Sequence, residues 1–207
     1  MTDLPSIILI SPPSKKDGEI DLLCQFFDAG LSRFHLRKPN FSAEDLKRYL
    51  NQIPSEHLSK IVVHRCPEVL ADFAVGGFHF RSNEPAHQVL KGTSSKSLHK
   101  LSELTGLKET MDYVFLGPIF RSISKQGYGP KISLNEIFSL FSSGRLNSLA
   151  KIPKVYALGG IRKKKMLRLS EVGFSGVALL GSVWGSRDPL KSIKDFLALG
   201  VSFSSRK

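Results

Sequence analysis

The stretch PKVYALGGIRKKKMLRLSEVGFSGVALLGSVW (residues 153–184) carries two apolar runs on either side of a segment with helical spacing. The first run, 153–161, has a glycine pair near its end, and the second covers 176–184. The segment between them, 162–173, ends on a glycine, which is typical of a helix terminus. A strand, a helix and a second strand in this order are typical of two parallel neighbours in one sheet.

The rest of the chain repeats this strand–helix unit. Ser42 stands three residues before Asp45, and Ser133 stands three residues before Glu136, which is the spacing of a capping box at a helix start. The expected strands cover 6–11, 34–37, 61–64, 77–80, 91–94, 112–120, 153–161 and 176–184. The expected helices lie between and after them, including 67–74, 84–90 and 189–199. One more carries Leu98, Leu101 and Leu104, and another carries Leu134, Ile137, Phe138 and Phe141.

Eight strand–helix units of roughly 25 residues account for the whole chain of 207 residues. Alternating strands and helices predict a parallel sheet, and eight units favour a closed barrel over an open doubly wound sheet. We therefore expect an α/β protein with a single (β/α)8 TIM barrel over residues 1–207. This length is the lower limit for that barrel, so the loops must be short.

The composition is that of a soluble globular chain, with 41% hydrophobic and 23% charged residues. No apolar run reaches the roughly 18 residues of a membrane span, so we expect no membrane contact. No basic residue precedes the first apolar stretch, which argues against a signal peptide. Cys24 and Cys66 do not make a disulfide framework, and we expect reduced thiols in a cytoplasmic protein.

A net charge of +12 indicates an acidic partner or only solubility. The basic residues are spread along the chain, and no helix shows a basic stripe with interleaved aromatics. We therefore do not expect nucleic acid as a partner. Phosphorylated small molecules are the expected partners. A homodimer is compatible with the apolar helix faces, which do not define an oligomeric state.

The active site of such a barrel lies at the carboxyl ends of its strands. Gly159 and Gly160 follow strand seven, and Leu180 and Gly181 end strand eight. Glycines let backbone N–H groups approach a phosphate at a helix N-terminus, although a plain turn explains the pair equally simply. These residues predict a phosphate site.

Three further positions supply charge and hydroxyl groups. Arg37 follows strand two, and arginine binds phosphate bidentately without losing its charge. Lys125 lies in a loop with Ser122 and Ser124, where an ammonium and hydroxyls can clamp a diphosphate. Ser94 is placed near the end of strand five. The alternative is an exposed arginine and an ordinary solvated loop.

The histidines raise the question of a metal or a general base. His35 and His79 lie within apolar strands, where hydrogen-bonded core histidines are expected. His64 ends strand three and is the better candidate for ligand contact. The chain contains neither H-E-x-x-H nor C-x-x-C, so no zinc site is expected.

Together these residues resemble the thiamine-phosphate synthase family, which includes thiazole tautomerases, over about residues 6 to 200. The most specific match is the family's D-Y-x-x-x-G-P-x-F-x-T-x-T-K. It is found as Asp112-Tyr113, Gly117-Pro118-Ile119-Phe120 and Ser122-Ile123-Ser124-Lys125. Other family motifs appear as His35-Leu36-Arg37-Lys38-Pro39, as Gly77 to Glu84, as Gly92-Thr93-Ser94 and as Ala157-Leu158-Gly159-Gly160-Ile161.

The resemblance implies an enzyme that joins a pyrimidine methyl diphosphate to a thiazole phosphate and releases pyrophosphate. It implies catalytic roles for Arg37 and Lys125. The remaining implied roles concern substrate binding: His35, His64, Ser94, Ser122 and Ser124 toward the pyrimidine diphosphate, and Gly160, Leu180 and Gly181 toward the thiazole phosphate.

The chain departs from the family at its metal site and at one catalytic position. The strand-three Asn-Asp pair is here His64-Arg65, and Glu84 replaces the second magnesium-binding Asp. Pro118 stands where the tautomerases have a catalytic histidine. Magnesium prefers octahedral oxygen ligands, and an arginine supplies none. We therefore expect no tightly bound cofactor, and magnesium only together with a diphosphate substrate.

Three interpretations follow from these departures. The first is a thiamine biosynthetic transferase with an incomplete metal site. The second is an isomerase of a thiazole phosphate that uses a relocated base such as His64. The third is a non-catalytic protein that binds a phosphorylated ligand on the same barrel.

Overall fold

Eight parallel strands form a closed barrel in the computed structural model, which describes residues 4–86, 92–121 and 132–203. The strands pair in chain order, and β1 closes the barrel against β8 with Ile7 opposite Val177. This confirms the predicted (β/α)8 barrel. The strands are β1 (Ile7–Ile10), β2 (Phe34–Leu36), β3 (Ile61–Val63), β4 (Gly77–Phe80), β5 (Thr93–Leu98), β6 (Tyr113–Leu116), β7 (Lys154–Leu158) and β8 (Gly176–Leu179).

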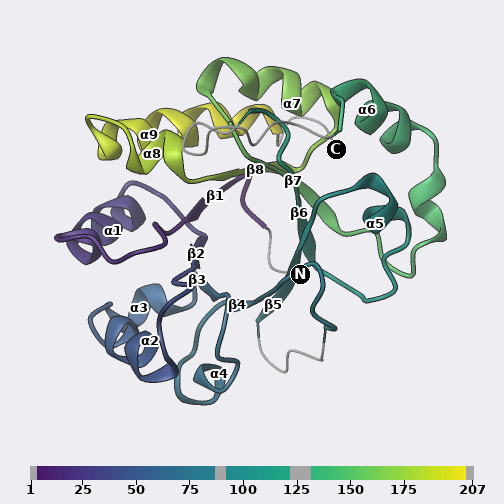
Figure 1. Ribbon diagram of the computed structural model, residues 1–207. Coiled ribbons are helices and arrows are strands. Elements are labelled where there is room, and N and C mark those ends of the chain that lie inside the picture. The colour runs from purple at the N-terminus through teal and green to yellow at the C-terminus, as the bar shows by residue number, and fades with distance from the viewer. Residues whose placement is uncertain (1–3, 87–91, 122–131, 204–207) are drawn as a thin grey trace.

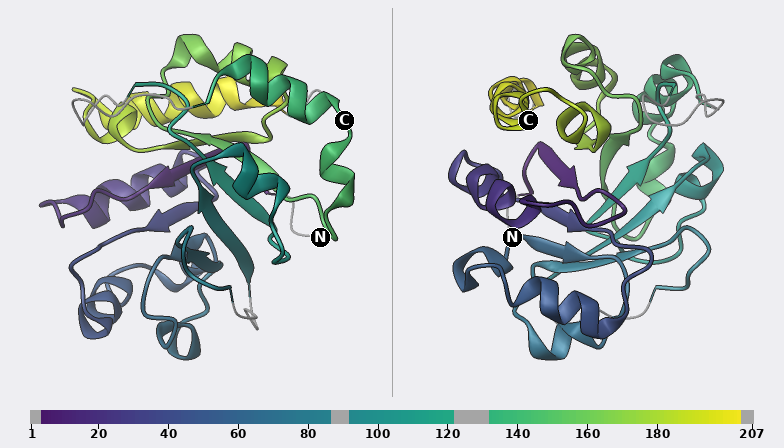
Figure 2. Two further views of the ribbon diagram at one scale, coloured as in Figure 1. Left: turned by 45° about the vertical axis from the view of Figure 1, so that its right-hand side comes forward. Right: turned by 60° about the vertical axis from the view of Figure 1, so that its left-hand side comes forward.

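Helices surround these strands on the outside (Figures 1 and 2). Both predicted capping boxes are present, with the hydroxyls of Ser42 and Ser133 accepting from the backbone N–H of Asp45 and Glu136. None of the helices among the described residues is long and apolar enough to cross a membrane. The helices are α1 (Glu19–Asp28), α2 (Ala43–Leu50), α3 (Ser55–Leu58), α4 (Val69–Asp72), α5 (Leu101–Thr105), α6 (Leu134–Ser142), α7 (Met166–Val172), α8 (Gly181–Trp184) and α9 (Pro189–Gly200).

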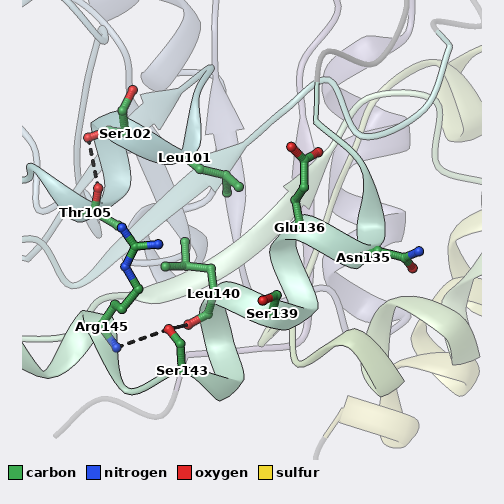
Figure 3. A pocket seen from close by; sticks show the side chains of 9 residues that line it. All are labelled: Leu101, Ser102, Thr105, Asn135, Glu136, Ser139, Leu140, Ser143 and Arg145. Atoms are coloured by element: carbon green, nitrogen blue, oxygen red, sulfur yellow. Dashed lines mark hydrogen bonds between the residues drawn. The ribbon is translucent and has the colours of Figure 1, made fainter.

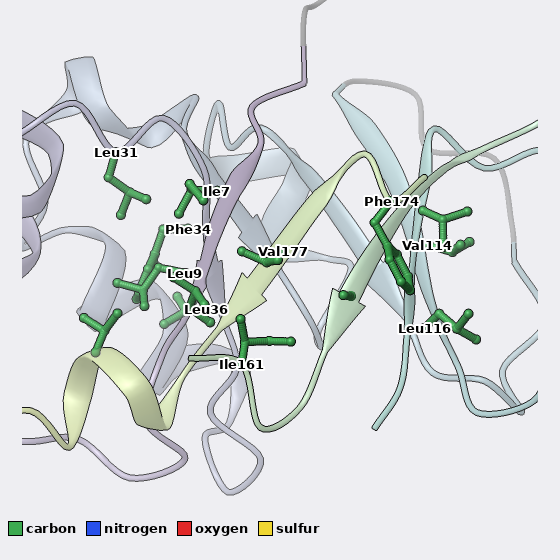
Figure 4. Close-up of a cluster of buried hydrophobic side chains, with 14 of the residues drawn as sticks. Ile7, Leu9, Leu31, Phe34, Leu36, Val114, Leu116, Ile161, Phe174 and Val177 are labelled. Atoms are coloured by element: carbon green, nitrogen blue, oxygen red, sulfur yellow. The ribbon is translucent and has the colours of Figure 1, made fainter. Parts of the chain in front are cut away.

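Side chains of successive strand residues point alternately into and out of the barrel, so the core has two layers. The outer layer fills the space between strands and helices and includes Ile7, Leu9 and Phe34 (Figure 4). A separate apolar cluster, formed by Ile8, Ile10, Tyr113, Phe115, Tyr156 and Ala178, fills part of the interior. The register of the strands thus decides which residues face the interior.

Strand five differs from the prediction. It was expected at about 91–94, but β5 runs from Thr93 to Leu98, and Leu98 ends this strand instead of starting a helix. The sequence TSSKSL is too polar to resemble a buried strand. It is stabilised because the buried Lys96 ammonium pairs with the Glu109 carboxylate at 2.7 Å. The small side chains of Ser95 and Ser97 point to the opposite face of the strand.

Three predicted strands are too long, and one helix face is shifted. The run 153–161 ends as a strand at Leu158, before its glycine turn. The run 112–120 leaves the sheet after Leu116, just before a glycine and a proline that lacks an N–H. The run 176–184 divides into β8 and α8, because a short apolar run does not distinguish strand from helix. Phe138 is 53% exposed, and α6 buries Ile137 and Leu140 instead. Of the expected helix 84–90, residues 84–86 are not helical and 87–90 lie outside the described residues.

Candidate active site

Five predicted site residues lie at the carboxyl ends of strands, and therefore at one end of the barrel. Arg37 directly follows β2 and His64 directly follows β3. Gly160 follows β7 by two residues, Leu180 directly follows β8, and Gly181 starts α8. His35 lies one position below Leu36 inside β2. Ser122, Ser124 and Lys125 lie outside the described residues, so their predicted roles stay predictions.

Ser94 is not at this end of the barrel. It is the second residue of β5, and its backbone N–H donates to the carboxylate of Asp112 at 2.8 Å, just before β6 begins. The prediction was wrong about its position because strand five was placed too early. Ser97 and His99 occupy the carboxyl end of β5 instead. The alternation of Ser95 and Ser97 with Lys96 and Leu98 was the signal that could have revealed this.

Three histidines from neighbouring strands meet inside the barrel. His35 Nδ1 lies 2.8 Å from His64 Nε2, and His35 Nε2 lies 2.7 Å from the Tyr113 hydroxyl. The rings of His64 and His79 stack with centroids 4.1 Å apart. His79 places Nδ1 2.8 Å from Ser95 Oγ and Nε2 2.8 Å from Ser97 Oγ. We call His35, His64 and His79 the histidine cluster.

Burial keeps this cluster uncharged. Desolvation lowers the pKa of His35 and of His64 well below the usual histidine value. His79 adds to the effect on both, and His35 adds to the effect on His64. Desolvation also lowers the pKa of His79 to about 3, with a further contribution from the positive charge of Arg37. All three imidazoles are therefore neutral at pH 7, and each offers one hydrogen-bond donor and one acceptor. The prediction that His35 and His79 are hydrogen-bonded inside the fold is confirmed.

The Arg37 side chain is exposed at the barrel mouth, and hydrogen bonds to Ser11 hold its backbone in place. The Ser11 hydroxyl donates to the Arg37 carbonyl at 3.0 Å, and the Arg37 N–H donates to the Ser11 hydroxyl oxygen at 2.8 Å. The next residue, Lys38, is buried and places its ammonium 2.7 Å from the carboxylate of Glu19. Tyr49 donates to that carboxylate at 2.8 Å. A buried ion pair thus anchors the segment that presents Arg37 to solvent.

A cavity of about 380 Å³ opens beside His64 at the mouth. Arg65 donates from its guanidinium to the Pro39 carbonyl, and Glu84 accepts from the Arg81 backbone N–H at 3.2 Å. The lining residues are His64, Arg65, Cys66, Pro67, Phe78, Arg81, Asn83 and Glu84.

This cavity tests the magnesium site that the family resemblance implies. Among the described lining residues Glu84 is the only carboxylate, and Arg65 and Arg81 bring two positive charges. Magnesium needs several oxygen ligands and is repelled by cations. The described residues therefore do not fit a magnesium ion held by the protein alone.

The glycine turn after β7 has a packing reason of its own. Gly160 has φ +64°, and a Cβ there would lie 2.4 Å from the Arg121 carbonyl oxygen. The neighbouring backbone is joined to the segment after β6, because Ile119 N–H donates to the Leu158 carbonyl at 2.8 Å. Only glycine allows this approach, which brings the ends of β6 and β7 together. The phosphate role of Gly160, Leu180 and Gly181 stays a prediction.

A larger cavity, of about 560 Å³, lies between α5 and α6 outside the barrel (Figure 3). Leu101 and Leu140 form part of its apolar wall, and Glu136 and Arg145 face it with opposite charges. None of the predicted site residues that the structure describes lines it. We therefore place the candidate active site at the barrel mouth.

Comparison with known proteins agrees with this geometry. A family model described as thiamine monophosphate synthase matches residues 7–183. A thiamine-phosphate synthase of Prochlorococcus marinus is 33% identical over 111 residues, which cover 54% of this chain and 29% of that protein. One from Limosilactobacillus reuteri is 25% identical, over 82% of this chain and 78% of its own length. The crystal structure of thiamine phosphate pyrophosphorylase from Bacteroides thetaiotaomicron superposes with a TM-score of 0.78 at 26% identity, covering 98% of this chain and 99% of that one.

Proposed function

The chain belongs to the thiamine monophosphate synthase family, and from this premise we propose that it joins a pyrimidine methyl diphosphate to a thiazole phosphate with release of pyrophosphate. The observation that carries the proposal is the placement of Arg37, His64, Gly160 and Gly181 at one end of a barrel that the family model spans almost completely. The reaction makes the protein a transferase of thiamine biosynthesis, and we assign it to the cytoplasm.

The chemistry of this reaction requires positive charge next to the leaving group. Negative charge builds on the pyrophosphate as its bond to the pyrimidine methyl carbon breaks, so cations that are already in place lower the barrier. Arg37 is exposed at the mouth, and Arg65 and Arg81 line the adjacent cavity. In this proposal Arg37 and Lys125 bind the diphosphate, with Ser122 and Ser124 as hydroxyl donors.

The histidine cluster would bind the pyrimidine. His64 faces the cavity, and the ring of His35 is held from behind by Tyr113. Neutral imidazoles offer one donor and one acceptor each, which suits the ring nitrogens and amino group of a pyrimidine. The thiazole phosphate would contact the backbone at Gly160, Leu180 and Gly181.

We further propose that magnesium binds only together with the diphosphate. The two arginines at the cavity oppose a free cation but attract the diphosphate, whose oxygens complete a metal's coordination. Calorimetry of the ligand-free protein with magnesium should show no binding. Micromolar binding without a diphosphate would contradict this part of the proposal.

One observation favours a second function. His64 is a neutral base at the mouth, linked through His35 to Tyr113 inside the barrel. Such a chain can pass a proton, as an isomerase of a thiazole phosphate requires. Proton exchange into a phosphorylated thiazole in deuterated water tests this alternative.

The decisive experiment supplies both substrates to the purified chain, with and without magnesium, and measures thiamine phosphate and pyrophosphate. We expect equal amounts of the two products. Binding of both substrates without any product would show a non-catalytic binder, and absence of binding would reject the proposal.

A further inference from the structure

The histidine cluster has a feature that the synthase reaction does not require. One ring nitrogen from each of His35, His64 and His79 can be chosen so that all three lie within 4.8 Å of one another. The three residues come from β2, from the residue after β3 and from β4, which are consecutive neighbours in the barrel. The geometry points to a binding site for a zinc-type divalent transition-metal ion, with the three imidazoles as ligands and a fourth position open to the cavity beside His64.

The distances are close to those of a metal site. In a tetrahedral zinc site each nitrogen is about 2.0–2.1 Å from the ion, so the nitrogens lie about 3.3 Å apart. His35 Nδ1 and His64 Nε2 are 2.8 Å apart, slightly closer than an ion between them would hold them. The ring centroid of His35 is 5.0 Å from that of His64 and 5.2 Å from that of His79. Small ring rotations therefore bring the three nitrogens into position.

The groups behind the histidines resemble the outer shell of a metal site. A histidine ligand usually donates its other N–H to an oxygen, which fixes the ring and its tautomer. His35 has the Tyr113 hydroxyl at 2.7 Å from Nε2, which leaves Nδ1 for the ion. His79 has Ser95 and Ser97 at its two nitrogens. An ion would replace one of these hydroxyls and keep the other.

The donor set and its surroundings select the kind of ion. Imidazole nitrogens suit zinc, copper and nickel, whereas magnesium prefers oxygen ligands. Burial keeps the imidazoles neutral, which is the form that binds metals. The ring centroid of Phe115 lies 4.7 Å from that of His35 and 4.8 Å from that of His79. The Phe115 ring therefore excludes water from that side of the cluster. Arg37, and Arg65 and Arg81 at the adjacent cavity, add positive charge nearby, so the fourth ligand should be an anion such as hydroxide or phosphate.

This inference does not depend on the synthase reaction, because the ion alone is the probe. The purified full chain is freed of metal with a chelator and titrated with Zn²⁺ by calorimetry and with Co²⁺ by visible absorption. We expect one ion per chain and the intense absorption of tetrahedral Co²⁺. Inorganic phosphate should alter that absorption, and an unchanged spectrum would contradict the open fourth position.

Variants locate the ion. His79→Gln and His35→Gln should abolish the Co²⁺ spectrum. Of Ser95→Ala and Ser97→Ala, only the variant that removes the hydroxyl left in place by the ion should weaken Zn²⁺ binding, by about tenfold. His57→Gln is the matched control, because His57 lies on α3 against Phe27 and outside the barrel interior. If the glutamine variants do not fold, X-ray absorption of the Zn²⁺-loaded native chain decides, and we expect three imidazole ligands. The proposed site would be overturned if Zn²⁺ did not bind, or if X-ray absorption showed fewer than three imidazole ligands. It would also be overturned if His57→Gln reduced binding as much as His79→Gln does.

Discussion

The barrel interior has two unlike halves. On the side of β1 and β6 to β8 it is filled by Ile8, Ile10, Tyr113, Phe115, Tyr156 and Ala178. On the side of β2 to β5 the inward positions carry His35, His64, His79, Ser95 and Ser97, joined by hydrogen bonds. The apolar half is a packed core. The polar half satisfies its groups internally and reaches the mouth at His64.

This difference separates stability from function. Apolar packing stabilises the fold in proportion to the buried area, whereas a satisfied polar network adds little net stability but holds specific groups in place. We therefore expect changes in the apolar half to unfold the protein and changes in the polar half to alter its chemistry.

The largest effect on stability should come from Phe115→Ala. Phe115 is 1% exposed and contacts both halves, and removing a buried phenylalanine costs about 3–5 kcal/mol. Denaturant unfolding measures this loss. Phe138→Ala is the control, because Phe138 is 53% exposed on α6 and its loss should change stability by less than about 0.5 kcal/mol. Equal effects of the two changes would contradict a packed apolar half.

The second effect is a loss of stability in mild acid, and it arises in the polar half. The pKa of His79 is about 3 in the fold against 6.5 normally, so between these values only the unfolded chain binds the proton. Stability therefore falls as the pH drops through this window, by about 2 kcal/mol for His79 between pH 7 and pH 5. Unfolding curves at both pH values measure it. His79→Gln should show a weaker pH dependence than the native chain, and an unchanged dependence would argue against a neutral His79.

The smallest effect on stability should come from Ser97→Ala. This change removes one hydrogen bond to His79 and should cost about 1 kcal/mol. A loss as large as that of Phe115→Ala would mean that the two halves do not differ as described. The same unfolding measurement compares the two variants directly.

The apolar runs predicted eight strands, and the number of strand–helix units predicted the closed barrel. The spacing of Ser42 and Asp45 and of Ser133 and Glu136 predicted both capping boxes. All of these depend on local sequence patterns. The position of a residue within its strand was harder to predict. The polar strand Thr93–Leu98 lacks a strong apolar pattern, so Ser94 was assigned to the wrong end of the barrel and Ser97 was missed.

Contacts between strands could not be predicted from the sequence. His35, His64 and His79 are separated along the chain by 29 and 15 residues, and no local motif joins them. Only the register of β2, β3 and β4 brings them together. Gly160 was noticed for its turn, but its close approach to Arg121 depends on the neighbouring strand end.

If the mouth of the polar half carries the reaction, the Arg37→Ala variant should release pyrophosphate more slowly than the native chain. Arg168→Ala is the matched control, since Arg168 is an exposed arginine on the outer helix α7. We predict that Arg37→Ala lowers kcat/KM about 100-fold while its unfolding free energy stays within about 0.5 kcal/mol of the native value. Arg168→Ala should match the native rate. If Arg37→Ala and Arg168→Ala had the same kcat/KM, the reaction would not depend on the mouth of the polar half.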